Sequence, residues 1–248
     1  MMTKDKVALV TGSGQGLGKA IAFALAKEGA KLAINDIPFN EAKARDTVDE
    51  LRAKGVEAEL FLADVTEEAS VNTMVEKVLG HFGRIDILVN NAGINRDGLV
   101  HKGDLKNWNA VVNVNLTGPF ICTKAVLPSM RQNNYGRIVN VSSLTARMGI
   151  FGTGYYATTK SGLLGLTRVT AAENSTKGIT CNALAPGYIK TDMMMKYSQE
   201  QLDALIAKIP AGRLAEPEEI AAAALFLAAD TSAYITGAIL DINGGYLI

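Results

Sequence analysis

Tyr156 and Lys160 are the two residues whose types and spacing first suggest chemistry. Side chains four residues apart share one face of a helix, so the Lys160 ammonium is expected to lie beside the Tyr156 phenol. A free phenol has a pKa of about 10, and a nearby cation lowers that pKa by stabilising the phenolate. The pair could therefore act as a general acid and base near neutral pH. The adjacent Tyr155 has no lysine four residues later and is predicted to be a packing or pocket-wall residue.

A tyrosine and a lysine at this spacing are usually accidental when they stand alone, and two further polar residues support them. Ser143 directly follows the predicted strand 138–142 and precedes Tyr156 in the chain. Asn115 lies between two predicted helical segments. These four residues are the candidate catalytic set.

A glycine-rich turn near the start of the chain predicts a nucleotide site. The apolar run 7–11 leads directly into it, and a helical pattern begins within it. Gly12, Gly16 and Gly18 allow a tight turn, bring backbone N–H groups close to a pyrophosphate and aim a helix N-terminus at it. Asp36 closes the next predicted strand, where its carboxylate can accept hydrogen bonds from both hydroxyls of an adenosine ribose.

Asp36 also predicts which dinucleotide is bound. Its carboxylate would repel a phosphate on the adenosine ribose, whereas it suits the free hydroxyls. The turn itself holds Gln15 and no Lys or Arg that could neutralise such a phosphate. We therefore predict NAD(H) rather than NADP(H) as the cofactor.

The elements that position these residues follow from the apolar pattern. Apolar runs of strand length alternate with amphipathic stretches of helix length along the whole chain, which predicts βαβ units and a parallel sheet. The runs are rich in Val, Ile and Leu, as expected when helices cover both faces of a sheet. Ligands of such open sheets bind beyond the carboxyl ends of the strands. Seven strands of one open α/β sheet are predicted, at residues 7–11, 32–36, 58–64, 85–90, 138–142, 179–185 and 238–242.

Two apolar stripes mark helices that face the core. Both repeat at helical spacing, and they consist of Leu17, Ile21 and Leu25 in the first, and Ile220, Ala224, Leu227 and Ala228 in the second.

Composition excludes several classes of function. The 248-residue chain has 25 Lys and Arg against 25 Asp and Glu, so it lacks the basic excess that nucleic acid binding needs. Hydrophobic residues make up 48% of the chain and charged residues 20%, which predicts a globular protein with a sizeable core. Only His81 and His101 are histidines, so no metal site and no Ser-His-Asp hydrolase are predicted.

The chain is predicted to be a soluble cytoplasmic protein with no membrane partner. Residues 1–6 carry charges where a signal peptide would be apolar, and the apolar run 220–229 is about half the length of a membrane span. Cys122 and Cys181 lack the number and spacing of a disulfide framework or metal site. We interpret both as small buried hydrophobes in a reducing compartment.

Taken together, these residues resemble the short-chain dehydrogenase/reductase family across essentially the whole chain. The resemblance implies a single Rossmann domain over residues 1–248, with a seven-stranded parallel sheet and helices on both faces. It also implies a catalytic tetrad at the four candidate positions. The segments that carry it are the glycine turn from Thr11 to Gly18, Asn90-Asn91-Ala92-Gly93, Asn115, Ser143, Tyr156, Lys160 and Pro186-Gly187.

The resemblance implies a role for each member of the tetrad. Ser143 would orient the substrate carbonyl oxygen, and Tyr156 would deliver the proton to it. Lys160 would hold the ribose hydroxyls and lower the pKa of Tyr156. Asn115 would fix a water that links Lys160 to solvent.

Cofactor contacts are implied along the same edge of the sheet. Asp64, Val65 and Asn91 would contact the adenosine half, although Asn91 could instead be a capping or strand-bridging amide. Ile189 and Thr191 would contact the nicotinamide carboxamide. The full predicted cofactor set is Gly12, Gln15, Gly16, Leu17, Gly18, Asp36, Asp64, Val65, Asn91, Ala92, Gly93, Tyr156, Lys160, Pro186, Gly187, Ile189 and Thr191.

Within the family, the chain is most similar to 3-oxoacyl thioester reductases, including acetoacetyl-CoA reductases, through segments 94–97, 188–193 and 217–220. Residues 188–214 are expected to form the lid that selects the substrate. Met193, Met194 and Met195 would offer flexible contacts to an acyl chain or ring, or would pack on the core of the lid itself.

Two departures favour a coenzyme A ester, a small free ketone or a secondary alcohol over a carrier-protein substrate. Reductases of the fatty-acid pathway usually prefer NADPH, whereas Asp36 predicts NADH. Members that dock acyl carrier protein tend to carry basic residues at two sites. Lys177 fits one of them, but residues 132–134 of this chain are uncharged.

Two other functions stay open. A dehydrogenase of a cyclic, steroid, sugar or small secondary alcohol would use the same tetrad. A nucleotide-sensing regulator or scaffold would not need a phenol and an ammonium four residues apart. For a reductase as for a dehydrogenase, the resemblance implies a homo-oligomer, usually a tetramer, assembled through helices around 108–130 and 156–176.

Overall fold

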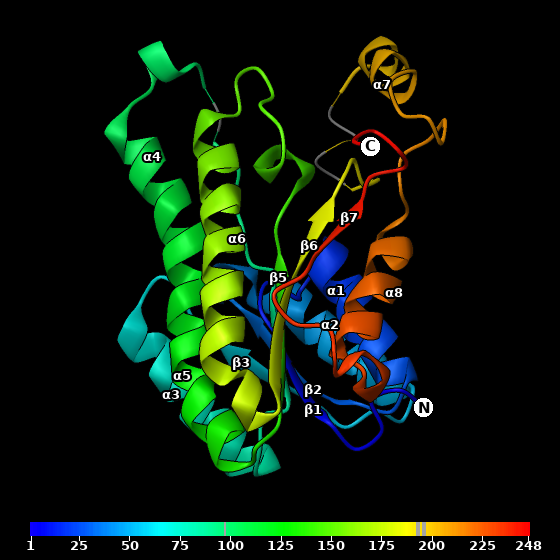
Figure 1. Cartoon of the computed structure of the whole chain (residues 1–248). Coiled ribbons are helices and arrows are strands. Elements are labelled where there is room, and N and C mark those ends of the chain that lie inside the picture. Colours follow the sequence, from blue (N-terminus) through cyan, green and yellow to red (C-terminus); the bar gives the residue numbers. More distant parts are fainter. Residues whose placement is uncertain (97, 192–193, 195–196) are drawn as a thin grey trace.

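Seven parallel strands form one open sheet with helices on both faces (Figure 1). The computed structural model describes residues 1–96, 98–191, 194 and 197–248. The sheet order is β3-β2-β1-β4-β5-β6-β7, which confirms the predicted Rossmann α/β fold. The strands are β1 (Val7–Val10), β2 (Lys31–Asp36), β3 (Ala58–Leu62), β4 (Ile87–Asn90), β5 (Gly136–Val141), β6 (Ile179–Pro186) and β7 (Ile239–Ile242).

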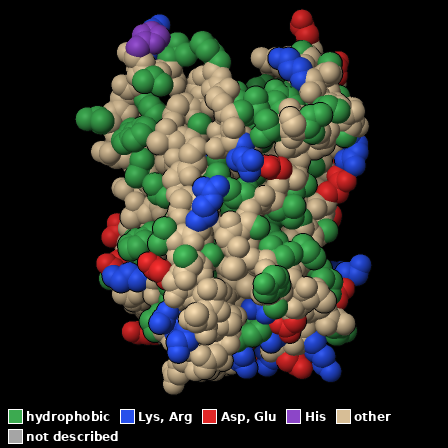
Figure 2. Space-filling view, viewed as in Figure 1, with side chains coloured by type: hydrophobic (Ala, Val, Ile, Leu, Met, Phe, Trp, Pro, Cys, Tyr) green, Lys and Arg blue, Asp and Glu red, His purple; other side chains and the backbone are tan. Residues whose placement is uncertain are grey.

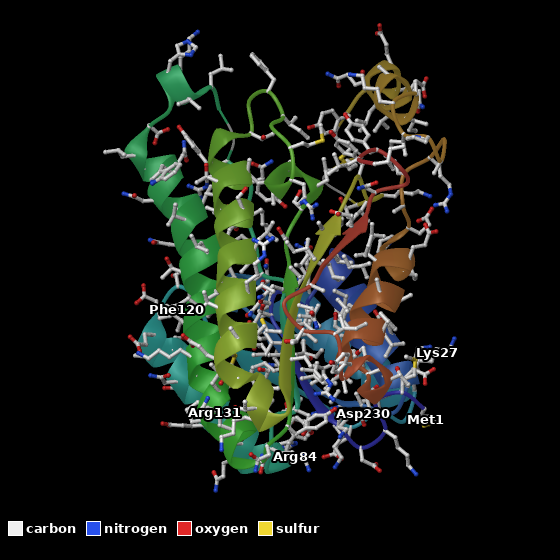
Figure 3. All side chains as sticks on the ribbon, in the orientation of Figure 1. Met1, Lys27, Arg84, Phe120, Arg131 and Asp230 are labelled. Carbon is white, nitrogen blue, oxygen red and sulfur yellow. The ribbon has the colours of Figure 1, made fainter. Side chains whose placement is uncertain are left out.

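The observed strands match the predicted ranges to within two residues at each end, and β5 shows why they differ. Its predicted start at residue 138 leaves out Arg137, which is charged but only 4% exposed. The guanidinium donates hydrogen bonds to the carbonyl oxygens of Gly136 and Gly178 and pairs with Asp230 at 3.2 Å. A buried arginine satisfied in this way lets β5 begin two residues earlier. Arg84 and Asp230 lie at this amino edge of the sheet, near the lower end of Figure 3.

Each face of the sheet has its own apolar core. The predicted stripes face the first core, where Ile21, Leu25, Ile220 and Leu227 are at most 1% exposed. Helices α1 (Gly16–Lys27), α2 (Glu41–Ala53) and α8 (Pro217–Ala228) cover that face. The opposite face carries α3 (Glu68–Phe82), α4 (Leu105–Val112), α5 (Gly118–Gln132) and α6 (Gly154–Asn174). Helix α7 (Gln199–Ile206) lies beyond the carboxyl edge (Figure 1).

Short helical turns connect several of these elements. They are 3₁₀ turns η1 (Pro38–Asn40), η2 (Val100–Lys102), η4 (Leu144–Ala146), η5 (Ser175–Lys177) and η7 (Asp230–Ser232), and the π turn η3 (Asn113–Thr117).

Asn115 lies between the two helices α4 and α5, as predicted, and the π turn η3 joins them into one helical stretch. The cause is Pro119, which has no N–H to donate to the carbonyl of Asn115 four residues earlier. A π turn accommodates the missing α-helical bond and widens the helix at Asn115.

Among the described residues, Leu105–Gln132 is the one helical stretch long and apolar enough to cross a membrane by length and composition. Part of it is buried inside the protein, at 44% of its most apolar window. Ile121, Val126 and Met130 of α5 belong to the core under the sheet, and this packing suits a core helix.

Charged side chains of both signs crowd the lower end of the molecule, which is the amino edge of the sheet (Figure 2). The strands point toward the opposite, upper end (Figure 1). The candidate site residues follow the strands at that upper, carboxyl edge.

Candidate active site

The glycine-rich turn between β1 and α1 has the backbone shape that a pyrophosphate site requires. Gly12 and Gly16 have φ of +62° and +56°, in the region that favours glycine. Helix α1 begins at Gly16, and Gln15 at its N-cap is extended and makes no side-chain cap bond. The first N–H groups of α1 at Gly16, Leu17 and Gly18 are therefore not used by that cap and could bind a phosphate.

Close packing holds this turn against the end of β4. Asn91 donates hydrogen bonds from Nδ2 to the carbonyl oxygens of Thr11 and Gly12, at 2.9 and 3.0 Å. Thr11 Oγ1 accepts from the backbone N of Asn91 and of Ala92, both at 3.0 Å. The side chain of Asn91 is thus the strand-bridging amide that the sequence left as the alternative to a cofactor contact.

Gly18 has no room for a side chain, and Gly18→Ala tests the turn. A Cβ there would meet Asn91 Nδ2 at 2.5 Å and overlap the carbonyl oxygen of Gly12. We expect Gly18→Ala to weaken dinucleotide binding by about tenfold or more and to lower the free energy of unfolding by about 1–3 kcal/mol. Fluorescence titration with NADH and urea denaturation measure the two effects.

Gly80→Ala is the matched control for that substitution. Gly80 lies in α3 and a Cβ there would meet nothing within 4 Å, so alanine should keep cofactor binding and leave stability equal or slightly higher. Unchanged NADH affinity in Gly18→Ala would show that the turn does not need this close approach.

Asp36 ends β2 beside the turn, and its carboxylate is 6% exposed. Oδ2 accepts from the backbone N of Gly14 at 3.0 Å. Oδ1 accepts from the backbone N of Ile37 and from Asn40 Nδ2, both at 2.9 Å. Three donors therefore hold the carboxylate in one position next to the glycine turn.

Asp64 and Val65 follow β3 at the same edge. Asp64 Oδ1 accepts from the backbone N and hydroxyl of Thr66, at 2.9 and 2.8 Å. Val65 is buried and packs against Gly118 at the start of α5. Asp64 and Val65 complete the part of the candidate dinucleotide site that follows strands β1 to β3.

Lys160 lies on the first turns of α6, one helical turn after Tyr156, as predicted. Its ammonium is 5.5 Å from the centre of the Tyr156 ring and donates to the carbonyl oxygen of Val141 at 2.7 Å. Only 3% of Lys160 is exposed, and this burial lowers its pKa from 10.5 to about 8. A buried cation therefore lies beside the half-buried phenol.

Ser143 lies on the segment between β5 and α6 that packs against those same turns. Ser142 Oγ donates to the carbonyl oxygen of Lys160 at 2.9 Å, and Ser161 Oγ donates to that of Ala146 at 3.2 Å. Ser143 is the N-cap of η4, and its Oγ accepts from the backbone N of Thr145 at 3.2 Å. It is 9% exposed, so its hydroxyl is held at the edge of the protein interior.

Asn115 reaches the same region from the π turn and is fully buried. Its Oδ1 accepts from the backbone N of Ile94 and its Nδ2 donates to the carbonyl oxygen of Ile94, both at 2.8 Å. Its Nδ2 also lies 3.5 Å from Thr159 Oγ1 on α6. The side chain is thus occupied in holding the segment after β4 against α6.

Gly93 is the point where these elements meet. A Cβ built on Gly93 would lie 3.4 Å from Asn115 Oδ1 and 3.6 Å from Lys160 Nζ. The structure therefore brings Gly93, Asn115 and Lys160 together, and Tyr156 and Ser143 lie on the two segments packed beside them.

Pro186 ends β6, and the chain then turns toward the lid. The backbone N of Gly187 donates to the carbonyl oxygen of Ile242, and a Cβ on Gly187 would meet Asn243 Cα at 2.8 Å. Ile189 forms an isolated parallel bridge with Ala215. Thr191 accepts a backbone hydrogen bond from Met194. Met193 and Met195, two of the three methionines expected at the substrate, lie outside the described residues, as do Asp97 and Asp192 of the similar segments.

Two features near the site were not found from the sequence. Lys43, on α2, donates from Nζ to Gln15 Oε1 at 2.6 Å, although the turn itself contains no cation. Tyr246, near the C-terminus, packs edge-on against Tyr188 with ring centres 5.4 Å apart. Both contacts join segments far apart in the chain, and no spacing in the sequence signals them.

Other assignments made from the sequence can also be checked. Tyr155 is buried and packs edge-on against Trp108, which confirms it as a packing residue. Cys122 and Cys181 are free and buried, and burial raises the pKa of each thiol to about 12. Within the described part of the chain, no group of three or more His, Cys, Asp or Glu side chains could hold a metal ion.

Comparison with known proteins adds independent information. The family model described as enoyl-(acyl carrier protein) reductase matches residues 12–247. The chain is 42% identical over 245 residues to the 3-oxoacyl-[acyl-carrier-protein] reductase FabG of Escherichia coli strain K12, covering 99% of this chain and 98% of that one.

Two further similar proteins are described with other substrates. The chain is 43% identical over 245 residues to the (2S)-[(R)-hydroxy(phenyl)methyl]succinyl-CoA dehydrogenase subunit BbsD of Thauera aromatica, with 99% and 98% coverage. A crystal structure described as a "putative gluconate dehydrogenase" from Agrobacterium tumefaciens superposes with a TM-score of 0.95. It is 36% identical to this chain, with 99% of this chain and 97% of that chain covered.

Proposed function

Because the chain belongs to the short-chain dehydrogenase/reductase family, we propose that it transfers a hydride between NAD(H) and a 3-oxoacyl or 3-hydroxyacyl thioester of coenzyme A. Members of this family are oxidoreductases that act on ketone or alcohol groups with a nicotinamide cofactor. The observation that carries the proposal is the buried Lys160 ammonium beside Tyr156, with Ser143 and Asn115 on the elements packed around them.

The residues around the glycine turn fit a dinucleotide. Gly12, Gly16 and Gly18 supply the tight turn and the helix N-terminus for the pyrophosphate. The carboxylate of Asp36 would accept the ribose hydroxyls and repel a phosphate in their place, which favours NAD(H). Asp64, Val65, Asn91, Ala92 and Gly93 would border the adenosine half, and Pro186, Gly187, Ile189 and Thr191 the nicotinamide half. When bound, the nicotinamide supplies or accepts the hydride.

The chain's own residues would handle the proton and orient the substrate. Ser143 Oγ would donate a hydrogen bond to the substrate carbonyl oxygen, where negative charge develops as the ketone is reduced. Tyr156 would give its phenolic proton to that oxygen, and would take it back when an alcohol is oxidised. Both groups approach the substrate from the carboxyl edge of the sheet.

Lys160 and Asn115 would support that proton transfer. The Lys160 ammonium stabilises the phenolate form of Tyr156 by charge and would bind the cofactor ribose from the same position. Pro119 leaves the carbonyl of Asn115 without its regular α-helical donor, so it can accept from a water that leads protons toward Lys160.

The substrate class rests on the relatives and on two features of this chain. FabG is described as acting on a carrier-protein thioester and BbsD as part of a CoA-ester dehydrogenase, so a thioester is common to both descriptions. Uncharged Gln132, Asn133 and Asn134 provide no cation for an acidic carrier protein, whereas a coenzyme A ester does not need one there. The lid over residues 188–214 would cover the acyl group.

We expect rapid oxidation of NADH by the purified enzyme with acetoacetyl-CoA, and a rate at least about tenfold lower with NADPH at matched concentration, because Asp36 opposes the extra phosphate. The initial loss of absorbance of the reduced cofactor measures both rates. Rapid loss with NADPH alone would contradict the cofactor assignment.

Absence of turnover with either cofactor, in a protein that still binds NADH, would contradict the thioester substrate. Reduction of NAD⁺ on addition of gluconate or other polyhydroxy acids, followed as a gain of absorbance of the reduced cofactor, then tests the second candidate, a sugar-acid dehydrogenase. That candidate is favoured by the structural similarity to the chain described as a gluconate dehydrogenase.

We also propose that the enzyme is a cytoplasmic homotetramer. Phe120 on α5 and Val169 on α6 are 51% and 55% exposed on the helices expected to meet a second copy (Figure 3 labels Phe120). Sedimentation velocity measures the assembly, and a monomer or a dimer would contradict the tetramer.

A further inference from the structure

A lysine from α2 reaches the glycine-rich turn. Lys43 lies in the first turn of α2, and its Nζ donates to Gln15 Oε1 at 2.6 Å. Gln15 is the N-cap of α1, at the point where the turn enters the helix. The contact therefore places an ammonium group at the edge of the dinucleotide site.

The first two turns of α2 are packed tightly onto the glycine turn. Thr47 Oγ1 donates to the carbonyl oxygen of Gly14 at 3.1 Å. A Cβ built on Gly14 would lie 2.8 Å from Asp36 Oδ2 and 3.0 Å from the backbone N of Ala44. Asp36 Oδ2 and the backbone N of Ala44, the residue after Lys43, therefore lie within about 6 Å of each other, because each is about 3 Å from that Cβ position.

The neighbouring charges differ from Lys43 in their partners. Arg45 pairs with Glu41 at 2.6 Å, and Lys19 pairs with Glu50 at 2.8 Å. Lys43 instead contacts a neutral amide, so this contact orients its ammonium without neutralising it. Gln15, which Lys43 contacts, directly follows Gly14, and the backbone N of Gly14 donates to Asp36.

We propose that Lys43 is a latent phosphate-binding residue of the adenosine-ribose site, masked in this chain by Asp36. The proposal rests on the proposed function in one respect, the position of the cofactor ribose at Asp36. With Asp36 charged, its repulsion of a ribose 2′-phosphate outweighs the attraction of Lys43. When an uncharged residue replaces Asp36, Lys43 binds the phosphate by a charge-assisted hydrogen bond and the site accepts NADPH.

The test is a double-mutant cycle read by direct binding, with no substrate present. The variants are Asp36→Asn, Lys43→Met and the double variant, titrated with NADPH and with NADH by cofactor fluorescence. Asparagine keeps the shape of the side chain and one acceptor oxygen, which can still accept from the backbone N of Ile37 and from Asn40, while the N–H of Gly14 loses its acceptor. Lys54→Met, at the C-cap of the same helix and away from the turn, is the matched control in both backgrounds.

We expect Asp36→Asn to bind NADPH about tenfold or more tightly than the parent does, and the double variant to lose most of that gain. NADH affinity should change by less than about twofold on Lys43→Met, and Lys54→Met should preserve the gain. A gain that survives in the double variant, or no gain in Asp36→Asn, overturns the proposal.

The parent protein reports separately on the cofactor assignment. If the parent already binds NADPH more tightly than NADH, the proposed preference for NAD(H) fails, yet loss of NADPH binding in Lys43→Met would still identify Lys43 as the phosphate ligand. If Lys43→Met has no effect on NADPH binding in any background, the role of Lys43 fails whatever the parent prefers.

Discussion

Tyr156→Phe should lower kcat by about 10³-fold, because it removes the only proton that the proposed mechanism delivers to the substrate oxygen. The ring and its position one turn before Lys160 are kept, so packing changes little. The Kd for NADH should stay within about twofold, since the substitution removes one hydroxyl and keeps the other predicted cofactor contacts. Steady-state rates with acetoacetyl-CoA and fluorescence titration with NADH measure the two quantities.

Tyr155→Phe is the matched control for this prediction. Tyr155 is the adjacent phenol, but it is buried against Trp108 and lies one position away on the helix. Its substitution should leave kcat within about threefold of the parent. Turnover above a few per cent in Tyr156→Phe, or an equal loss in both variants, would remove Tyr156 as the acid.

Lys160→Met should lower kcat by about 10²-fold or more while making the protein more stable at neutral pH. The stability gain follows from burial, which lowers the pKa of Lys160 from 10.5 to about 8. Keeping the ammonium charged inside the protein then costs about 3 kcal/mol, and loss of its hydrogen bond to Val141 offsets about 1 kcal/mol of the gain. Methionine has a similar volume, and we expect the Tm to rise by about 5 °C.

The stability gain of Lys160→Met should become smaller as the pH rises. The folded protein releases the Lys160 proton near pH 8, whereas the unfolded chain holds it to about pH 10.5, so the unfolded chain binds more protons in that window. The stability of the parent therefore rises with pH between these values, and the advantage of Lys160→Met shrinks. Urea denaturation at pH 7 and pH 9.5 measures it. A difference that is equal at both pH values, or a destabilised variant at pH 7, would contradict the buried charge.

The sheet could be predicted because its five inner strands are buried on both faces and read as short, mainly apolar runs. The start of β5 could not be predicted, because Arg137 is charged and its partners Gly178 and Asp230 come from distant segments of the chain. A buried charged residue whose hydrogen-bond partners are distant in the sequence cannot be distinguished from a surface residue by the pattern of apolar and polar residues. The same limit hid Lys43, which lies far from Gln15 in the chain.

The candidate tetrad could be predicted from residue types and order, and the structure adds how it is held. Asn115 lies between two helices as predicted, and the structure adds that it belongs to a π turn whose cause, Pro119, is visible in the sequence. The bridging role of the Asn91 side chain was one of two alternatives, and only the contacts with Thr11 and Gly12 distinguish them. A polar residue at the end of a strand can serve the fold or the ligand, and its type alone does not tell which.

The strand order divides the sheet into two halves that can form one after the other during synthesis. Strands β1 to β3 lie on one side of the β1–β4 pair and β4 to β7 on the other, each half built from consecutive strands. The hydrogen bond from Val7 N to Asp86 Oδ2, beside that pair, joins residues 79 positions apart. Closing so long a loop costs entropy before any contact forms, so we expect this docking of the halves to limit the folding rate. Until it occurs, the edges of β1 and β4 are open to other chains, and aggregation on refolding should depend on protein concentration.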